Sequence, residues 1–292
     1  MKKILKSVLV SLLGVLFFAG ASAQKSKAGN SLLWKISKKG NKEASYLFGT
    51  IHMICTEDYF WTNSMQMALD NTRQLCLEMN LSDPNLITDA SLMMMDLSGG
   101  TLRDYFKNES DYILVANYIK DSLGQELAIA ERMKPAALQM MISMGLVSGP
   151  CKETVSYELK LVEKAKLKDL EINGLETLAE QMEVLESIPT DSIINQMIRI
   201  AKGEKDNDED FEKLIAAYKK QDLTTLNKTM EKSMSAGGTD GKIFIENRNK
   251  KWIAPMSKMM SEKPTFFAVG AGHIYGLLEL LRNAGYTVEA VK

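Results

Sequence analysis

The stretch SYLFGTIH, residues 45–52, carries the two features that decide the fold. Its first half is aromatic and apolar and predicts a β-strand over residues 45–48, and its second half is a Gly-x-x-His motif. The same pattern returns near the other end of the chain, where the apolar run 265–269 predicts a strand that leads into GAGH, residues 270–273. A strand followed directly by Gly-x-x-His therefore occurs near both ends of the chain.

The elements around the two motifs indicate an α/β fold. In order they are strands over residues 32–36 and 45–48, a helix over 62–72, a strand over 74–79 and, after the second motif, a helix over 274–283 and a strand over 286–291. The first two strands predict a hairpin, and the strand–helix–strand order after them predicts a parallel crossover. We therefore expect strands from both ends of the chain to form one central, mostly parallel sheet flanked by helices.

The middle of the chain is predicted to be a large helical insertion, at about residues 85–260. Apolar residues at three- and four-residue spacing predict helices over residues 85–97, 110–123, 135–147, 154–165, 175–187, 190–202, 208–218, 223–233 and about 242–260. One predicted strand, residues 168–172, interrupts them. The expected domain organisation is a leader over residues 1–23 and a single domain over residues 24–292.

Composition excludes several classes of protein. The chain has 292 residues, of which 45% are hydrophobic, and 36 Lys and Arg are balanced by 37 Asp and Glu. This is the composition of a globular protein, not of a disordered or collagen-like one. Binding to nucleic acid needs a clustered excess of positive charge, and the formal net charge of -1 argues against it. We expect no nucleic-acid partner.

The first 23 residues have the pattern of a signal peptide. Lys2, Lys3 and Lys6 precede the apolar stretch 8–18, and ASA at residues 21–23 supplies the small residues of a cleavage site. The apolar stretch is short for a membrane-spanning helix. We predict an exported protein, periplasmic or extracellular, that is not stably inserted in a membrane after cleavage before Gln24.

Three cysteines, Cys55, Cys76 and Cys151, are an odd number without the spacing of a disulfide framework or a zinc ribbon. One bridge at most can form among them. Because each is flanked by apolar residues, buried free thiols are the favoured interpretation.

The two Gly-x-x-His motifs contain both histidines of the chain, His52 and His273. Ligands of open α/β sheets bind beyond the carboxyl ends of the strands, so the two imidazoles are expected to converge on one site. Glu78, near the end of the 74–79 strand, completes a set with the composition of a two-His, one-carboxylate metal site. Spacing leaves three roles open for the histidine pair: metal binding, acid–base catalysis or stabilisation of two turns.

Five motifs in order make the chain resemble the TraB/GumN family. They are LWKI (33–36), SYLFGTIH (45–52), GLET (174–177) with Gln181, NRN (247–249) with Trp252, and VGAGHIYG (269–276). The family is related to the Tiki proteins and to the superfamily of erythromycin esterase and ChaN-like proteins. The resemblance implies a central sheet flanked by helices.

Tiki proteins are metal-dependent proteases, and the resemblance implies roles for matching residues here. His52 and His273 become metal ligands, and Glu78 becomes the carboxylate ligand or the general base. The implied cofactor is a divalent ion, with manganese or cobalt favoured and zinc as a third candidate. Arg248 is expected either to bind a substrate carboxylate or oxyanion or to form an ion pair that holds its helix to the sheet.

Two further acids are weaker candidates for the site. Glu158 is expected to be a catalytic acid or base, and Glu176 a supporting partner at the crevice. The function expected from these residues is that of an exported metal-dependent hydrolase, a protease that uses metal-activated water on a peptide or protein substrate. The alternative is a non-catalytic regulatory protein that binds a peptide, a metal or haem. The oligomeric state is left open.

Overall fold

The computed structural model describes residues 30–292 except 42, 125, 149–150, 205–207 and 237–239. The predicted leader, residues 1–23, and its cleavage site lie outside the described residues. No helix among the described residues is long and apolar enough to cross a membrane.

One six-stranded sheet organises the fold, in the order β6-β4-β7-β2-β1-β8. Its strands are β1 (Leu33–Ser37), β2 (Ser45–Thr50), β4 (Gln74–Leu77), β6 (Glu171–Gly174), β7 (Thr265–Gly270) and β8 (Thr287–Val291). Strands β6, β4, β7 and β2 run parallel, and β1 pairs antiparallel with both β2 and β8. The expected hairpin and the single sheet built from both ends of the chain are confirmed. The crossover is parallel as well, although β7 lies between β2 and β4.

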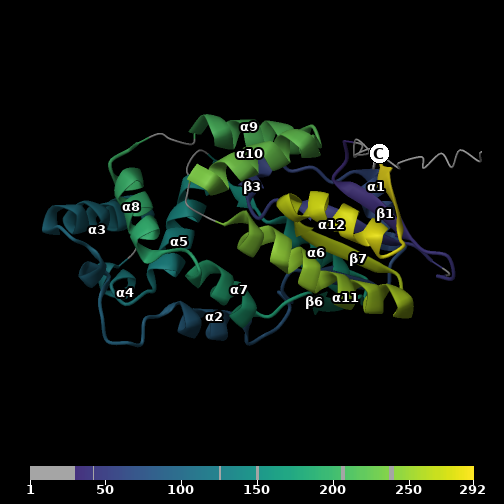
Figure 1. Cartoon of the computed structure of the whole chain (residues 1–292), viewed down its shortest axis with the longest axis horizontal. Coiled ribbons are helices and arrows are strands. Elements are labelled where there is room, and N and C mark those ends of the chain that lie inside the picture. The colour runs from purple at the N-terminus through teal and green to yellow at the C-terminus, as the bar shows by residue number, and fades with distance from the viewer. Residues whose placement is uncertain (1–29, 42, 125, 149–150, 205–207, 237–239) are drawn as a thin grey trace, which may run out of the picture.

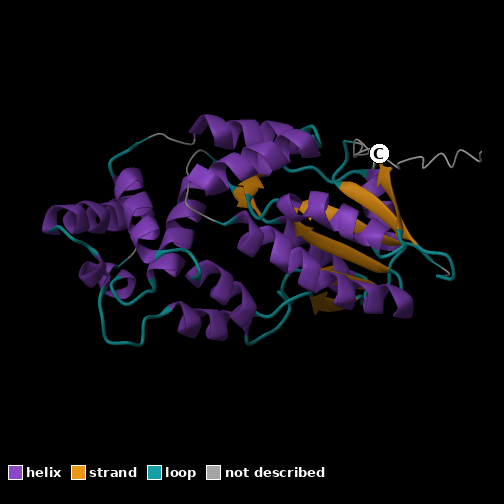
Figure 2. Cartoon of the chain, in the orientation of Figure 1, coloured by secondary structure: helices purple, strands orange, loops and turns teal. Residues whose placement is uncertain are grey.

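Helices surround this sheet and extend beyond it (Figures 1 and 2). They are α1 (Asn63–Asp70), α2 (Leu86–Met94), α3 (Glu109–Leu123), α4 (Leu127–Ala130), α5 (Pro135–Ser148), α6 (Tyr157–Leu167), α7 (Leu178–Glu186), α8 (Thr190–Ala201), α9 (Asp208–Lys219), α10 (Leu223–Ala236), α11 (Asn247–Glu262) and α12 (Ala271–Asn283). Short segments add η1 (Thr56–Asp58), η2 (Leu102–Tyr105), the π-helical η3 (Lys242–Glu246) and a small ladder of β3 (Ile54–Cys55) with β5 (Thr154–Val155).

Two hydrophobic cores result from this arrangement. The main core packs α6, α11 and α12 on the sheet and includes Phe48, Phe266 and Trp252, all fully buried. A second core joins α3, α5 and α8 through residues such as Ile119 and Met197. The second core belongs to the helical lobe that Figure 1 shows away from the sheet.

Several predicted boundaries differ from the structure, among them the following three. The helix expected from residue 154 begins at Tyr157, because Thr154 and Val155 pair with β3 and the Ser156 hydroxyl caps the helix by accepting from Leu159 N. The strand expected over residues 168–172 is Glu171–Gly174, since Lys168 ends α6 and Asp169 turns the chain with a φ of 52°. The helix after the second motif begins at Ala271, three residues earlier than predicted.

The preference for three free thiols is wrong for two of the cysteines. Cys55 and Cys151 form a disulfide across a sequence separation of 96 residues, whereas Cys76 is free and buried in the sheet. Composition could not show this, because the pairing depends on the β3–β5 ladder that brings the two segments together.

Candidate functional site

The register of β2 and β7 brings the two Gly-x-x-His motifs side by side. Gly49 lies opposite Val269, and Thr50 lies opposite Gly270, so both motifs leave the sheet at the same edge. The two segments then diverge: His52 lies in the loop after β2, whereas His273 lies in the first turn of α12. Close approach of the two motifs requires Gly49, because a Cβ there would lie 2.9 Å from Ile274 Cγ1 and 3.2 Å from Ala271 Cα.

Four of the five predicted site residues line one cavity of about 400 Å³. They are His52, Glu78, Arg248 and His273. Glu78 follows directly on β4, and Arg248 lies in the first turn of α11. Helices α9 and α10 contribute the apolar side of the cavity, through residues such as Leu214 and Met230. Glu158, the fifth predicted residue, lies behind His52 and does not line the cavity.

The Glu78 carboxylate is buried and fully engaged. Its Oε1 accepts from Gly270 N at 2.7 Å, and its Oε2 accepts from Arg248 Nη2 at 2.6 Å and from Gln181 Nε2 at 3.3 Å. Burial favours the neutral carboxyl, but the charge of Arg248 and the Gly270 N–H outweigh it, so the pKa of Glu78 lies below its ordinary value. Glu78 is therefore ionised at neutral pH.

All five N–H groups of Arg248 have partners. Nε and Nη2 donate to the two oxygens of Glu176 at 3.1 and 2.5 Å, Nη2 also donates to Glu78, and Nη1 donates to Phe244 O at 3.2 Å and to His273 Nε2 at 3.1 Å. The Glu176 carboxylate also accepts from Trp252 Nε1 at 3.1 Å. This arrangement matches the ion-pair alternative for Arg248, in which the guanidinium holds α11 to the sheet edge. Glu176 is the second carboxylate that binds Arg248, beside Glu78, and so lies where the sequence suggested a supporting partner.

The contacts of His273 fix its protonation. A guanidinium only donates, so His273 Nε2 accepts from Arg248, and Nδ1–H donates to Asn249 Oδ1 at 2.7 Å. The Asn249 amide is oriented by its other end, since Nδ2 donates to His273 O at 3.2 Å. Burial lowers the pKa of His273 to about 4. His273 is thus a neutral imidazole with its Nε2 lone pair facing Arg248.

His52 has the opposite environment. Its side chain is 75% exposed, and its Nδ1 lies 3.1 Å from Oε1 of the buried Glu158. The Glu158 carboxylate also accepts from Thr50 Oγ1 at 2.6 Å and from Ser156 Oγ at 3.0 Å. The hydrogen bond with Glu158 raises the pKa of His52 above its ordinary value. Since Nδ1 is taken, Nε2 is the nitrogen left for a ligand or a proton.

The disulfide and the β3–β5 ladder hold His52 and Glu158 together. The ladder pairs Ile54 with Val155, and the disulfide joins Cys55 to Cys151, so the loop after His52 is fastened to the segment before Glu158. Thr56 N also donates to Glu153 O at 3.0 Å. The contact between the two side chains therefore depends on backbone pairing.

The present arrangement does not fit a divalent ion on His52, Glu78 and His273. Among the described residues, no group of three or more His, Cys, Asp or Glu side chains is placed to hold a metal. The physical reason lies in Arg248, whose guanidinium takes both Glu78 Oε2 and the Nε2 lone pair of His273. A metal could bind His273 Nε2 only after Arg248 had moved away from it.

Comparison with known proteins places the chain in a family. A model of the TraB/PrgY/gumN family matches residues 32–290, which covers both motifs and the sheet except for the last residue of β8. The chain belongs to the TraB/PrgY/gumN family. The family resemblance drawn from the five motifs is thereby confirmed.

Relatives of this TraB-family chain include proteins named as Tiki metalloproteases. It is 24% identical to Metalloprotease TIKI2 of Danio rerio over 89% of its length and 61% of that protein's. It is 25% identical to Metalloprotease TIKI1 of Xenopus tropicalis, over 91% of its length and 62% of that protein's. The chain thus spans about three-fifths of the length of these relatives. No solved structure matches it.

Sequence reasoning missed Asn249 and Thr50 as parts of this TraB-family site. Asn249 sets the tautomer of His273, and Thr50 helps to hold Glu158. Asn249 lies in the motif NRN and Thr50 in the motif SYLFGTIH. Membership of these motifs was the sequence signal that could have identified the two residues. Their roles depend on partners that are distant in the sequence.

Proposed function

We propose that this chain is a hydrolase of peptide or related acyl bonds and that the cavity lined by His52, Glu78, Arg248 and His273 is its active site. The observation that carries the proposal is the pairing of His52, exposed at the cavity, with the buried Glu158 carboxylate. The distant relatives named as metalloproteases support hydrolysis as the reaction class.

His52 is the proposed acid–base group. In the neutral form of the ring, which the raised pKa of His52 makes the major form only at alkaline pH, Nε2 accepts a proton from water as the water oxygen attacks the carbonyl carbon, and it returns that proton to the leaving amine when the C–N bond breaks. Glu158 holds Nδ1, keeps the imidazole in one tautomer and stabilises the imidazolium that forms, in the way a carboxylate supports the histidine of a serine-protease triad.

The first turn of α12 is the proposed site for the developing oxyanion. Residues Ala271 to His273 line the cavity, and the start of a helix carries unpaired N–H groups with partial positive charge. Arg248 and Glu78 position this turn, because Glu78 binds Gly270 N and Arg248 binds His273. His273 then acts as a neutral positioning residue.

We further propose that the hydrolysis depends on a metal ion, and this more specific part of the proposal comes from the family resemblance. The predicted ligands are His52, Glu78 and His273, with manganese or cobalt favoured over zinc. Because Arg248 engages two of the three, we expect any ion to bind weakly unless Arg248 is replaced. Export to the periplasm or the extracellular space also stays a prediction.

Cleavage of a mixed peptide library by the purified protein tests the proposal. Mass spectrometry would compare wild type, His52→Ala and Glu158→Gln with Asp121→Asn, an exposed carboxylate on α3 that serves as the matched control. Each would be assayed with chelator and with added manganese, cobalt or zinc. We expect products from wild type and the control only. Products that persist in His52→Ala, or none under any condition, would overturn the proposal.

A non-catalytic peptide-binding protein is the second candidate. The observation that favours it is the saturation of Arg248, whose N–H groups are all used within the protein and offer none to a substrate. Binding of library peptides without cleavage, unaffected by Glu158→Gln, would support this candidate over the hydrolase.

A further inference from the structure

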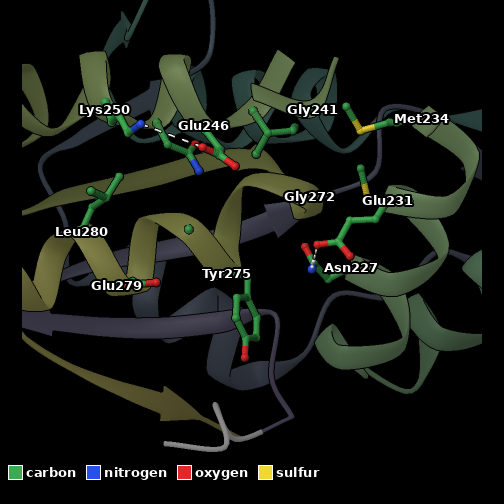
Figure 3. Close-up of a pocket in the computed structure, with 14 residues that line it drawn as sticks. Asn227, Glu231, Met234, Gly241, Glu246, Lys250, Gly272, Tyr275, Glu279 and Leu280 are labelled. Carbon is green, nitrogen blue, oxygen red and sulfur yellow. Dashed lines mark hydrogen bonds and ion pairs between the residues drawn. The ribbon is translucent and has the colours of Figure 1, made fainter. Parts of the chain in front are cut away.

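A second cavity adjoins the proposed active site. It has a volume of about 520 Å³ and lies between α10, the η3–α11 segment and α12 (Figure 3). Four residues line both cavities: Met230, Met234, Ile245 and Gly272. The two hollows are therefore neighbours that share a wall.

Gly272 and Met230 form the junction between the cavities. Gly272 belongs to the second Gly-x-x-His motif and precedes His273 directly. A Cβ at residue 272 would lie 2.3 Å from Met230 Cε and 2.9 Å from Met230 Sδ, so the missing side chain is what lets Met230 of α10 rest on α12. Met230 thus contributes a flexible thioether side chain to the shared wall, and such a side chain adapts readily to a ligand.

The second cavity is apolar inside and acidic at its rim. Met230, Met234, Ile245 and Leu280 are partly buried and supply aliphatic walls. Exposed Glu231, Glu246 and Glu279 supply carboxylates, against which the lining offers one cation, Lys250. Lys250 Nζ lies 3.9 Å from Glu246 Oε2, and Figure 3 shows this pair on the same side of the cavity. Glu279 has no ion-pair partner among the described residues.

These features match one kind of ligand. A lysine or arginine side chain buries an aliphatic stem against apolar surface and keeps its charged end in water. The second cavity offers methionine, isoleucine and leucine walls for such a stem and carboxylates at the solvent edge for its charge. An acidic side chain would meet like charge at the rim, and a plain aliphatic side chain would leave Glu279 without an ion-pair partner among the described residues.

We infer that the second cavity is a substrate subsite that binds a lysine or arginine side chain of a peptide, next to the bond placed at His52. The inference rests on the proposed function. It names the substrate class, peptides with a basic residue close to the cleaved bond, and it makes Glu246 and Glu279 specificity-determining residues.

A binding experiment tests the subsite apart from turnover. The protein would carry His52→Ala, and calorimetry or fluorescence anisotropy would measure the Kd of two peptides that are identical except for lysine or norleucine at one position. We expect lysine to be preferred about 3- to 10-fold, the range of one or two exposed charge pairs, and the preference to be lost in the added variant Glu246→Gln, Glu279→Gln. Asp121→Asn should retain it. Equal affinities, or no binding of either peptide, would overturn the inference.

A cleavage experiment separates this inference from the proposed function. With the peptide library, wild type should favour products with lysine or arginine beside the cut, and the double Gln variant should lose that preference. Asp121→Asn should retain both the cleavage and the preference. Cleavage that depends on His52 but shows no basic preference would overturn the subsite and leave the hydrolase standing. Lysine-selective binding without any cleavage would overturn the hydrolase and leave the subsite as a peptide-binding site.

Discussion

The two histidines of this chain have the same local sequence and opposite chemistry. His52 is exposed and bonded to a carboxylate, whereas His273 is buried and accepts from a guanidinium. The first environment favours the imidazolium and the second favours the neutral ring. We therefore propose the proton-transfer role for His52, whose neutral form is the base, and the positioning role for His273.

The protonation of His273 gives a pH-dependent stability. Its pKa is lowered to about 4 in the folded protein, against about 6.5 for an unperturbed histidine, so between these values the unfolded chain binds more protons. The sign follows: this contribution to stability is complete above pH 6.5, decreases as pH falls to 4 and then stays constant. Denaturant unfolding at several pH values should show this extra slope in wild type and not in His273→Gln. Equal slopes in both proteins would contradict it.

Asn249 is expected to be needed for the position of His273. Asn249→Leu removes the acceptor of Nδ1–H and the donor to His273 O in a buried place, which should lower the free energy of unfolding by about 1–3 kcal/mol. The matched control is Asn227→Leu on α10, since Asn227 is partly exposed and bonds to exposed Glu231. Urea denaturation would compare them, and equal losses would contradict a special role for Asn249.

Among the elements, the β3–β5 ladder has the largest effect on the site for its size. It has two residues in each strand, yet it fastens the His52 loop to the start of α6, where Glu158 lies. The disulfide between Cys55 and Cys151 closes this connection covalently. The element therefore sets the geometry of the proposed acid–base pair.

Removal of the disulfide should loosen that pair. In Cys55→Ser, Cys151→Ser, we expect stability to fall by about 2–4 kcal/mol and the pKa of His52 to return toward its ordinary value, as Glu158 loses its fixed position. NMR titration of the histidine ring signals would measure the pKa. Cys76→Ala is the control, because Cys76 is a free thiol in the sheet. An unchanged pKa in the double variant would show that the ladder suffices alone.

At the scale of the whole molecule, the described residues form two hydrophobic cores that share no residue. The core under the sheet contains the strands that carry both motifs, and the lobe core joins α3, α5 and α8. The candidate site draws its residues from elements of the sheet core and from the loops that leave it.

A cavity in the lobe core should leave the site intact. Ile119→Ala, at a fully buried position of α3, is expected to cost about 2–5 kcal/mol, with faster hydrogen exchange confined to the lobe helices α3, α5 and α8. The matched variant Leu75→Ala in β4 should raise exchange across the sheet and disturb the His52 ring signal. Loss of sheet protection in Ile119→Ala would show that the two cores unfold as one unit.

Most elements of the fold could be predicted from local sequence. The apolar run 265–269 predicted β7, and the two short apolar runs near residues 32–48 predicted β1 and β2. Both predictions hold because a buried strand needs a short continuous or alternating apolar pattern. The pairing of two strand-then-Gly-x-x-His stretches also predicted that His52 and His273 meet, since carboxyl ends of parallel strands lie at one edge. These inferences use only neighbours in the chain.

Contacts between distant side chains had to come from the tertiary structure. Glu78 and Gly270 are 192 residues apart, and Thr50 and Glu158 are 108 residues apart, so no local sequence pattern predicts their hydrogen bonds. The same holds for the Cys55–Cys151 bridge and for the bonds of Arg248 to Glu78, Glu176 and His273. Residue types and strand order follow from short-range hydrophobic periodicity, whereas charge state and tautomer follow from burial and from the partners that the packed fold supplies.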